Sequence, residues 1–145
     1  MVMNPALVLR ALRGATTASA NTSEAIAEAV SELIETLVRD NALAGSQLLS
    51  VTFSVTADLD ACFPAAIARR RSDWDAVALL DCQQMAVEGD LPRCIRLLAH
   101  AWMEAPRTLV HPYLREASHL RPDRARPQVG GEAVARDPTS CPADH

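Results

Sequence analysis

Lysine is absent from this sequence of 145 residues, so all 14 of its Lys or Arg positions are arginine. Aromatic residues make up only 3% of the chain, which predicts a core of Leu, Val, Ile and Ala. No apolar run is long enough to span a membrane, and none near the N-terminus precedes a cleavage site. These absences favour neither a membrane-spanning nor an exported protein, so by default we expect a cytoplasmic enzyme or binding protein.

An excess of positive charge is also absent, since the net charge is -4 and the pI is about 5.5. Proteins that bind nucleic acid or an anionic membrane surface usually carry a basic patch, so we expect neither as a partner. The cysteines lack Cys-x-x-Cys spacing, and the histidines do not cluster with them, so we predict no metal site and reduced thiols. These cysteines are Cys62, Cys82, Cys94 and Cys141.

The length of the chain predicts one domain with enough core to fold without disulfides. The composition changes after Pro122, because residues 124–145 bring several prolines and glycines and almost no large apolar side chains. Such a segment buries too little apolar surface to fold unless a ligand or partner orders it. We therefore predict a folded domain over residues 1–123 and a disordered tail over residues 124–145.

Hydrophobic periodicity predicts the element order β-α-β-α-β-α-β, with a short second helix, which indicates a layered domain of helices and strands. An apolar stripe runs from Ile26 to Val38, and Asn21, with an acid three positions on, is typical of a helix start. Pro64 suits the first position of a short helix that would carry Arg69, Arg70 and Arg71. Strands are expected at 7–13, 48–55, 76–80 (buried on both faces) and 113–120, and helices at 21–41, after Pro64 and at 91–103.

Four arginines stand in distinctive sequence settings and indicate a binding site for a small dianion. Arg13 precedes Gly14, Arg69 follows Phe63-Pro64-Ala65, Arg96 closes Cys94-Ile95-Arg96, and Arg121 opens Arg121-Pro122-Asp123. A guanidinium keeps its charge and binds carboxylates in a bidentate geometry. No nucleophile elbow, phosphate-binding loop or dinucleotide fingerprint accompanies these arginines.

The order and spacing of several motifs resemble the monofunctional chorismate mutases of the AroH class over about residues 9–123. The motifs are Arg13-Gly14-Ala15-Thr16-Thr17, Asp58-Leu59 with Phe63-Pro64-Ala65, Trp74, Gln83-x-Met85, Cys94-Ile95-Arg96, Tyr113-Leu114 and Leu120-Arg121-Pro122-Asp123. The resemblance implies an α+β fold, in which a mixed β-sheet carries helices on one face and three subunits form a trimeric pseudo-α/β-barrel. It also implies the rearrangement of chorismate to prephenate, active sites between subunits, and no cofactor.

The resemblance also implies roles for individual residues. Arg96 matches the arginine beside the ether oxygen of the substrate, Arg13 an arginine on its carboxylate side, and Tyr113 a tyrosine that hydrogen-bonds a carboxylate. The remaining matches lie at the subunit boundary or at the mouth of the site. They are Phe63, Ala65 and Arg69, which the neighbouring subunit would supply, and Leu120 and Arg121, which would help to close the site.

This sequence departs from the family pattern at three positions. Gln84 replaces the usual site glutamate, Asp81 replaces a cysteine three residues earlier, and Ala66 stands where relatives can carry lysine. Glutamine keeps hydrogen-bonding capacity but loses the charge. We therefore hypothesise that the carboxylate has moved from position 84 to Asp81, with Gln84 kept as a hydrogen-bond partner.

Other readings of the same residues remain open. Arg69 and its two neighbouring arginines could form a solvated helix face, and Tyr113 could be an ordinary interface residue. Arg13 or Arg96 could pair with a carboxylate within the chain, with Asp58, Asp81 and Glu88 as candidates. The whole protein could instead be a trimer that binds chorismate or prephenate with little or no turnover, or a scaffold for another enzyme of aromatic biosynthesis.

Overall fold

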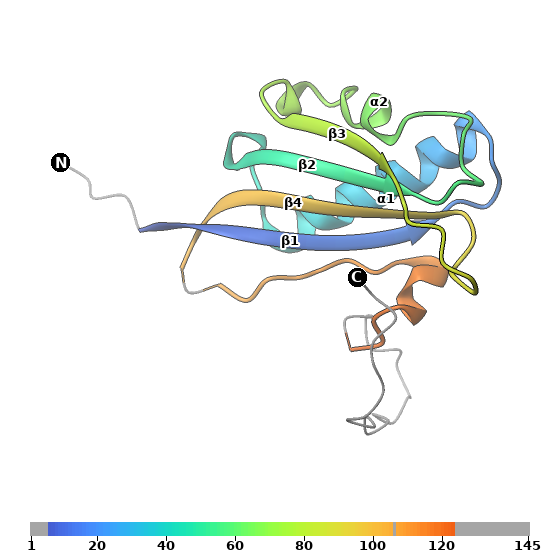
Figure 1. The fold of residues 1–145 in the computed structure, drawn as a ribbon. Coiled ribbons are helices and arrows are strands. Elements are labelled where there is room, and N and C mark those ends of the chain that lie inside the picture. The colour runs from blue at the N-terminus through green and yellow to red at the C-terminus, as the bar shows by residue number, and fades with distance from the viewer. Residues whose placement is uncertain (1–5, 106, 124–145) are drawn as a thin grey trace.

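The computed structural model describes residues 6–105 and 107–123, and the predicted 124–145 tail lies outside these residues. Within these described residues, one long helix, one short helix, three 3₁₀ turns and four strands follow one another (Figure 1). Their bounds are β1 (Leu7–Thr17), α1 (Ser23–Asn41), η1 (Gly45–Gln47), β2 (Leu48–Val55), α2 (Pro64–Ala68), η2 (Ser72–Trp74), β3 (Ala78–Gln83), β4 (Cys94–Glu104) and η3 (Arg115–His119).

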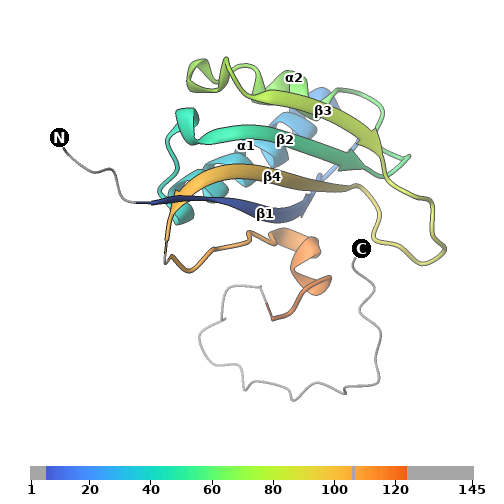
Figure 2. The same cartoon turned by 60° about the vertical axis from the view of Figure 1, so that its left-hand side comes forward.

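The four strands form one mixed sheet in the order β1-β4-β2-β3. β4 pairs antiparallel with both β1 and β2, and β3 pairs parallel with β2 at the edge of the sheet. Both helices lie on the same face of the sheet in two views that differ by 60° (Figures 1 and 2). The predicted α+β architecture, a mixed sheet with helices on one face, is therefore confirmed for the single chain.

Helix α1 covers the sheet because its apolar residues recur at helical spacing and form one buried stripe. The N-cap lies one residue later than predicted, since Thr22 rather than Asn21 caps the helix, and Thr22 Oγ1 accepts a hydrogen bond from Ala25 N (3.1 Å). Asn21 instead binds the loop before α2, where its Oδ1 accepts from Ala61 N (3.1 Å). The helix ends at Asn41, as predicted, and Ala42 takes a left-handed conformation with φ of 49°.

The core between α1 and the sheet is mainly aliphatic, as the low aromatic content predicted. Leu12 on β1, Val51 on β2 and Ile95 on β4 are fully buried, and they share a cluster with Leu33 and Leu37 on α1. Phe53 and Trp74 are the two large aromatic side chains in this cluster. The helix-covered face of the sheet therefore supplies the core, and the opposite face is left to carry other functions.

The prediction of a helix over residues 91–103 is wrong, because this segment is strand β4. Ile95, Leu97 and Ala99 are buried against the helices, whereas Leu98, between them, is 41% exposed on the other face. Apolar residues therefore occupy both faces, so the period-2 pattern of a half-buried strand is blurred in the sequence. Pairing with β1 on one side and β2 on the other makes this segment a central strand.

Two further strand predictions also need correction. Residues 113–120 form no strand, because only Tyr113 makes an isolated bridge, to Ala15, before the chain turns into η3. Strand β3 exists but begins at Ala78, and it is not buried on both faces, because Leu80 is 58% exposed at the sheet edge. A run of apolar residues at an edge can equally mark a surface that another chain covers.

Candidate active site

The segment after β4 returns along the free edge of β1 and brings Tyr113 beside Arg13. Pro112 O accepts from Ala15 N (2.9 Å), and Ala15 O accepts from Leu114 N (2.8 Å). Gly14 allows this close approach, because a Cβ at Gly14 would lie 3.0 Å from Pro112 O and 3.3 Å from Leu33 Cδ1. The glycine in the Arg13-Gly14 motif therefore lets the Tyr113 segment pack closely against β1.

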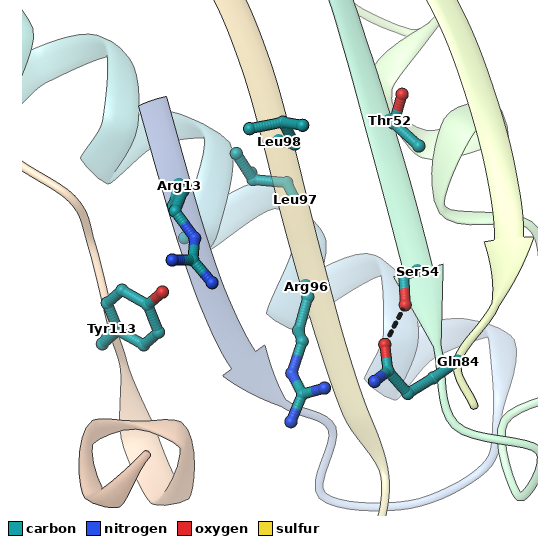
Figure 3. Close-up of a pocket in the computed structure, with 9 residues that line it drawn as sticks. Arg13, Thr52, Ser54, Gln84, Arg96, Leu97, Leu98 and Tyr113 are labelled. Carbon is teal, nitrogen blue, oxygen red and sulfur yellow. Dashed lines mark hydrogen bonds between the residues drawn. The ribbon is translucent and has the colours of Figure 1, made fainter. Parts of the chain in front are cut away.

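Arg13, Arg96, Gln84 and Tyr113 line one hollow of about 350 Å³ on the face of the sheet away from the helices (Figure 3). We call this hollow the arginine pocket. Its two arginines come from the neighbouring strands β1 and β4, and Tyr113 lies next to Arg13 on the returning segment (Figure 3). Its lining consists of Arg13, Gly14, Thr52, Ser54, Gln84, Arg96, Leu97, Leu98 and Tyr113.

Strand register explains why these side chains meet. Arg13 is opposite Leu98 across the β1–β4 pair, and Ser54 is opposite Arg96 across the β2–β4 pair. Residues opposite each other in a sheet point to the same face, so Arg13, Ser54 and Arg96 share the open face. A one-residue slip of β4 would turn Arg96 into the core, so the register decides whether the pocket exists.

Gln84 closes the β3 side of the pocket. Its backbone N–H donates to Val55 O (2.7 Å), which extends the pairing of β3 with β2 by one residue. Its Oε1 accepts a hydrogen bond from Ser54 Oγ (Figure 3). Since this bond uses the amide oxygen, the amide N–H groups of Gln84 remain the donors that it can offer to a bound molecule.

Arg96 forms an ion pair with Asp90, with 3.2 Å between Nη2 and Oδ1. The two side chains are only 12% and 18% exposed. Asp90, Gln84, Arg96 and Leu120 together line a second hollow that adjoins the arginine pocket and shares Gln84 and Arg96 with it. The carboxylate that pairs with Arg96 is therefore Asp90 and none of the three candidates considered from the sequence.

A separate hollow of about 380 Å³ contains Phe63 and Asp81, and we call it the phenylalanine pocket. Phe63 is 70% exposed there. Asp81 Oδ1 accepts from Ala65 N (2.9 Å) in the first turn of α2, and Ala65 itself is fully buried. This pocket is lined by Val55, Thr56, Ala57, Leu59, Asp60, Ala61, Cys62, Phe63, Pro64, Asp81, Cys82 and Gln83.

The family model for chorismate mutase type I matches residues 9–124. The chain belongs to this family. The resemblance drawn from the sequence motifs is confirmed. The fold is therefore that of a type I chorismate mutase chain, and the residues expected at the site can be located in it one by one.

Curated relatives and a solved structure match most of this chorismate mutase chain. It is 34% identical over 118 residues to chorismate mutase AroH of Bacillus subtilis (strain 168), covering 81% of this chain and 93% of that one. It is 42% identical over 118 residues to chorismate mutase AroH of Thermus thermophilus, covering 80% and 96%. A solved chorismate mutase from Clostridium thermocellum has a TM-score of 0.71 at 36% identity, covering 77% of this chain and 99% of that one.

The single chorismate mutase chain brings together only some of the expected site residues. The arginine pocket unites Arg13, Gln84, Arg96 and Tyr113. Asp81 is not among them, because it lies in the phenylalanine pocket on the other side of the sheet. Within one chain, therefore, Asp81 does not take the place of the carboxylate missing at position 84.

The other expected residues lie around these two pockets. Arg69 follows α2 as its C-cap, is exposed, and lines a fourth hollow with Trp74. The prediction that α2 would carry three arginines is wrong, because the helix ends at Ala68. Leu120 lines the hollow beside the arginine pocket, and Arg121 pairs with Asp123, with 3.2 Å between Nη2 and Oδ2.

Sequence reasoning missed two residues of this region, Ser54 and Asp90. The polar alternation of Ser50, Thr52 and Ser54 along β2 could have revealed Ser54, because it places these hydroxyls on a single face. Asp90 carries no such signal, since it reaches Arg96 through the irregular loop between β3 and β4. A loop residue can be assigned to a site only when the path of the loop is known.

The loop that follows β2 is tied to the start of β4 by Asp58. Asp58 Oδ2 accepts from Arg93 N (2.8 Å), and Arg93 is held at a φ of 49°. Burial raises the pKa of Asp58, but hydrogen bonds from Thr56 Oγ1 and Arg93 N and the charge of Arg93 outweigh it, so this pKa is lowered overall. The ionised form of Asp58 therefore stabilises the junction just before Cys94-Ile95-Arg96.

In residues 6–105 and 107–123, no group of three or more His, Cys, Asp or Glu side chains could hold a metal ion. Over the same part of the chain, none of the helices combines the length and the apolar character needed to cross a membrane. Cys94 is 1% exposed and packs inside the fold, as expected for a structural cysteine.

Proposed function

We propose that this protein is an enzyme that rearranges chorismate to prephenate in phenylalanine and tyrosine biosynthesis. The family model, the two AroH relatives and the solved chorismate mutase structure all support this activity. The observation that carries the proposal is the position of Arg13 and Arg96 on adjacent strands, facing one pocket with Tyr113 and Gln84. The expected cytoplasmic location remains a prediction from the sequence.

The reaction is a pericyclic rearrangement, so it needs neither a nucleophile nor a proton transfer. Negative charge grows on the ether oxygen as its bond to the ring breaks, and positive charge grows on the ring. A cation held beside that oxygen in a site of low water content stabilises the transition state more than the ground state. Because the arginine pocket provides two such cations, no cofactor is needed for this mechanism.

Each residue of the arginine pocket has a proposed role. Arg96 donates hydrogen bonds to the ether oxygen, where the charge develops. Arg13 and Tyr113 bind substrate carboxylate and hold the enolpyruvyl arm over the ring, which supplies the orientational part of catalysis. Gln84 donates an amide N–H to the substrate while Ser54 occupies its amide oxygen.

We also propose that the protein is a homotrimer in which each site forms between two subunits. The phenylalanine pocket supports this assembly, because it collects Phe63 and Asp81 at a place separate from the arginine pocket. If the phenylalanine pocket of one subunit, with Ala65 and Arg69 nearby, packs against the arginine pocket of the next, both sets of residues contact the same substrate. In that arrangement the carboxylate of Asp81 approaches from the neighbour, and the relocation hypothesis then applies across the interface.

The open face of the sheet offers an apolar surface for that neighbour. Leu9, Leu80, Leu98 and Trp102 lie on this face and are 47%, 58%, 41% and 42% exposed in the single chain. Adjacent exposed apolar side chains on a sheet commonly mark a protein interface. Leu120 and Arg121 would then lie near the mouth of each site.

A trimer that binds chorismate or prephenate with little turnover remains a second candidate, because Gln84 lacks the charge of the usual glutamate. A scaffold for another enzyme of the pathway is the third reading from the sequence. A chorismate consumption assay separates catalysis from both. Ligand binding without turnover would select the binding protein, and co-purification with a pathway enzyme without ligand binding would select the scaffold.

The deciding experiment compares chorismate consumption by the wild type and by Arg96→Ala. We expect kcat to fall at least roughly a thousandfold, because one donor to a developing oxyanion is worth about 10²–10³ and Arg96 also brings full charge. Arg70→Ala is the matched control, since Arg70 is an exposed arginine just after α2. A wild-type rate in Arg96→Ala would refute the proposed role of Arg96.

The shared site is tested by mixing two inactive variants. Arg96→Ala damages the arginine pocket, and Phe63→Ala damages the phenylalanine pocket. In a mixed trimer, some interfaces join an intact arginine pocket from the Phe63→Ala subunit to an intact phenylalanine pocket from the Arg96→Ala subunit. Activity should therefore return after the two variants are unfolded and refolded together. Activity that stays at the level of the separate variants would show that each chain forms its own site.

A further inference from the structure

Asp90 is the carboxylate that the described structure places against the key arginine. Its Oδ1 lies 3.2 Å from Arg96 Nη2 and also accepts a hydrogen bond from Leu91 N (2.8 Å). The turn that carries it is well defined, because Asp90 N donates to Val87 O (3.1 Å) and Gly89 takes the positive φ of 82°. The acceptor oxygen is therefore held in place before any substrate binds.

The ion pair leaves part of the guanidinium available. Arg96 Nε is buried, and it has no hydrogen-bond partner within residues 6–105 and 107–123. A buried N–H without an acceptor costs about 1–3 kcal/mol, so such a group usually has an acceptor in the working protein. Arg96 also lines both the arginine pocket and the adjoining hollow that contains Asp90. The guanidinium is thus bound through Nη2 on one side while another donor, Nε, is still unused.

The distribution of charge around Arg96 favours a functional role for the Arg96–Asp90 ion pair. The lining of the arginine pocket holds two arginines and no carboxylate. Gln84 contributes no charge, and Asp81 lies in the phenylalanine pocket. Within residues 6–105 and 107–123, Arg96 forms its ion pair with Asp90. An arginine without such a partner would have several rotamers open to it, each with a different N–H direction.

We propose that Asp90 is a positioning residue for Arg96, holding the guanidinium through Nη2 so that its remaining N–H groups are directed to the substrate oxygen at which negative charge develops. This inference rests on the proposed chorismate rearrangement. Asp90 does not itself touch the substrate in this scheme. Its carboxylate keeps Arg96 in the geometry needed by the transition state, so that little reorganisation is required when the charge appears.

The same ion pair could instead act as a competitor that must leave Arg96 before chorismate binds. The two roles have opposite kinetic signatures. Loss of a positioning residue lowers kcat, because the stabilisation of the transition state is lost. Loss of a competitor lowers KM and leaves kcat unchanged, because the substrate no longer has to displace the carboxylate.

The test measures kcat and KM of chorismate rearrangement for the full chain and for Asp90→Asn, Asp90→Ala and Asp90→Glu. For Asp90→Asn we expect kcat to fall about tenfold to a hundredfold, with KM changed less than about threefold. Asp90→Glu restores a carboxylate and should recover part of the rate lost in Asp90→Ala. Glu104→Gln is the matched control, because it removes an exposed charge from β4, the strand that carries Arg96, and should change kcat less than about twofold.

Each outcome decides the inference. A lower KM with unchanged kcat in Asp90→Asn identifies Asp90 as a competitor and overturns it. Unchanged kinetics, or an equal loss in Glu104→Gln, also overturns it. If Asp90→Asn does not fold, as judged by circular dichroism, Asp90→Ala decides: a lower kcat with KM changed less than about threefold supports positioning, and an unchanged kcat refutes it. An inactive wild type would refute the proposed function, whereas an active wild type with unaffected Asp90 variants refutes only the role of Asp90.

Discussion

Asp81 and Gln84 lie only three positions apart, yet they face different pockets. Asp81 Oδ1 accepts from Ala65 N (2.9 Å) beneath Phe63, whereas Gln84 Oε1 accepts from Ser54 Oγ beside Arg96. Side chains alternate between the faces of a strand, so an odd separation places them on opposite sides. A carboxylate at position 81 therefore lies on the opposite face of the sheet from a carboxylate at position 84.

Asp81→Asn tests whether that carboxylate acts in catalysis from a neighbouring subunit. The amide oxygen can still accept from Ala65 N, so we expect the free energy of unfolding to change by less than about 0.5 kcal/mol. If the charge faces the substrate across an interface, kcat/KM should fall about tenfold. Asp81→Cys, which restores the residue usual in the family, should show a similar loss of rate. Unchanged kcat/KM in both variants would remove Asp81 from the active site.

Gly14→Ala tests the close packing that holds Tyr113. The new Cβ would lie 3.0 Å from Pro112 O, so we expect a loss of about 1–3 kcal/mol in the free energy of unfolding. The displaced segment should also raise KM about threefold to tenfold, since Tyr113 would bind carboxylate less well.

Gly45→Ala is the control for this glycine. Its Cβ would meet Asp73 O at 1.9 Å, so the variant should lose more stability than Gly14→Ala. Gly45 lies in η1, away from the arginine pocket, so the folded fraction should keep the wild-type KM. Equal KM values for the two variants would contradict a role for Gly14 in placing Tyr113.

Asn41→Ala tests the side chain that fastens the returning segment to the end of α1. Asn41 is 1% exposed, its Oδ1 accepts from Val110 N (2.8 Å), and its Nδ2 donates to Val110 O (2.8 Å). Alanine would leave the backbone N–H and C=O of Val110 without these hydrogen bonds, so we expect the free energy of unfolding to fall by about 2–3 kcal/mol. Denaturant titration measures the loss, and Ser31→Ala, at an exposed position of α1, should change it by less than about 0.5 kcal/mol.

Asp58→Asn tests the pH dependence that follows from the lowered pKa of Asp58. A carboxyl whose pKa is lower in the folded state stabilises the fold above its unfolded pKa, near pH 4, and loses this contribution as pH falls through the folded value. Asp58→Asn should therefore be less stable than the wild type at neutral pH, and the difference should shrink at acidic pH. Urea unfolding at several pH values, with exposed Asp75→Asn as control, checks this; a difference independent of pH would contradict it.

Local patterns in the sequence were enough to predict several elements and four residues that share one pocket. The apolar stripe predicted α1 and its end at Asn41, the β-branched run predicted β2, and Pro64 predicted the start of α2. These features depend on side-chain period, stiffness and fixed φ, which are local properties of the chain. The family motifs located Arg13, Arg96, Gln84 and Tyr113, and the fold brings these four residues together.

Only the tertiary structure decided the identity of β4 and the partner of Arg96. Residues 94–104 are apolar on both faces, so their period did not separate helix from strand until β1 and β2 paired with them. Asp90 reaches Arg96 through a loop whose path depends on Gly89 and on the two strands that it joins. Long-range pairing and loop geometry bring together residues that no local pattern connects, and this is why the sequence offers other carboxylates, and not Asp90, as candidate partners of Arg96.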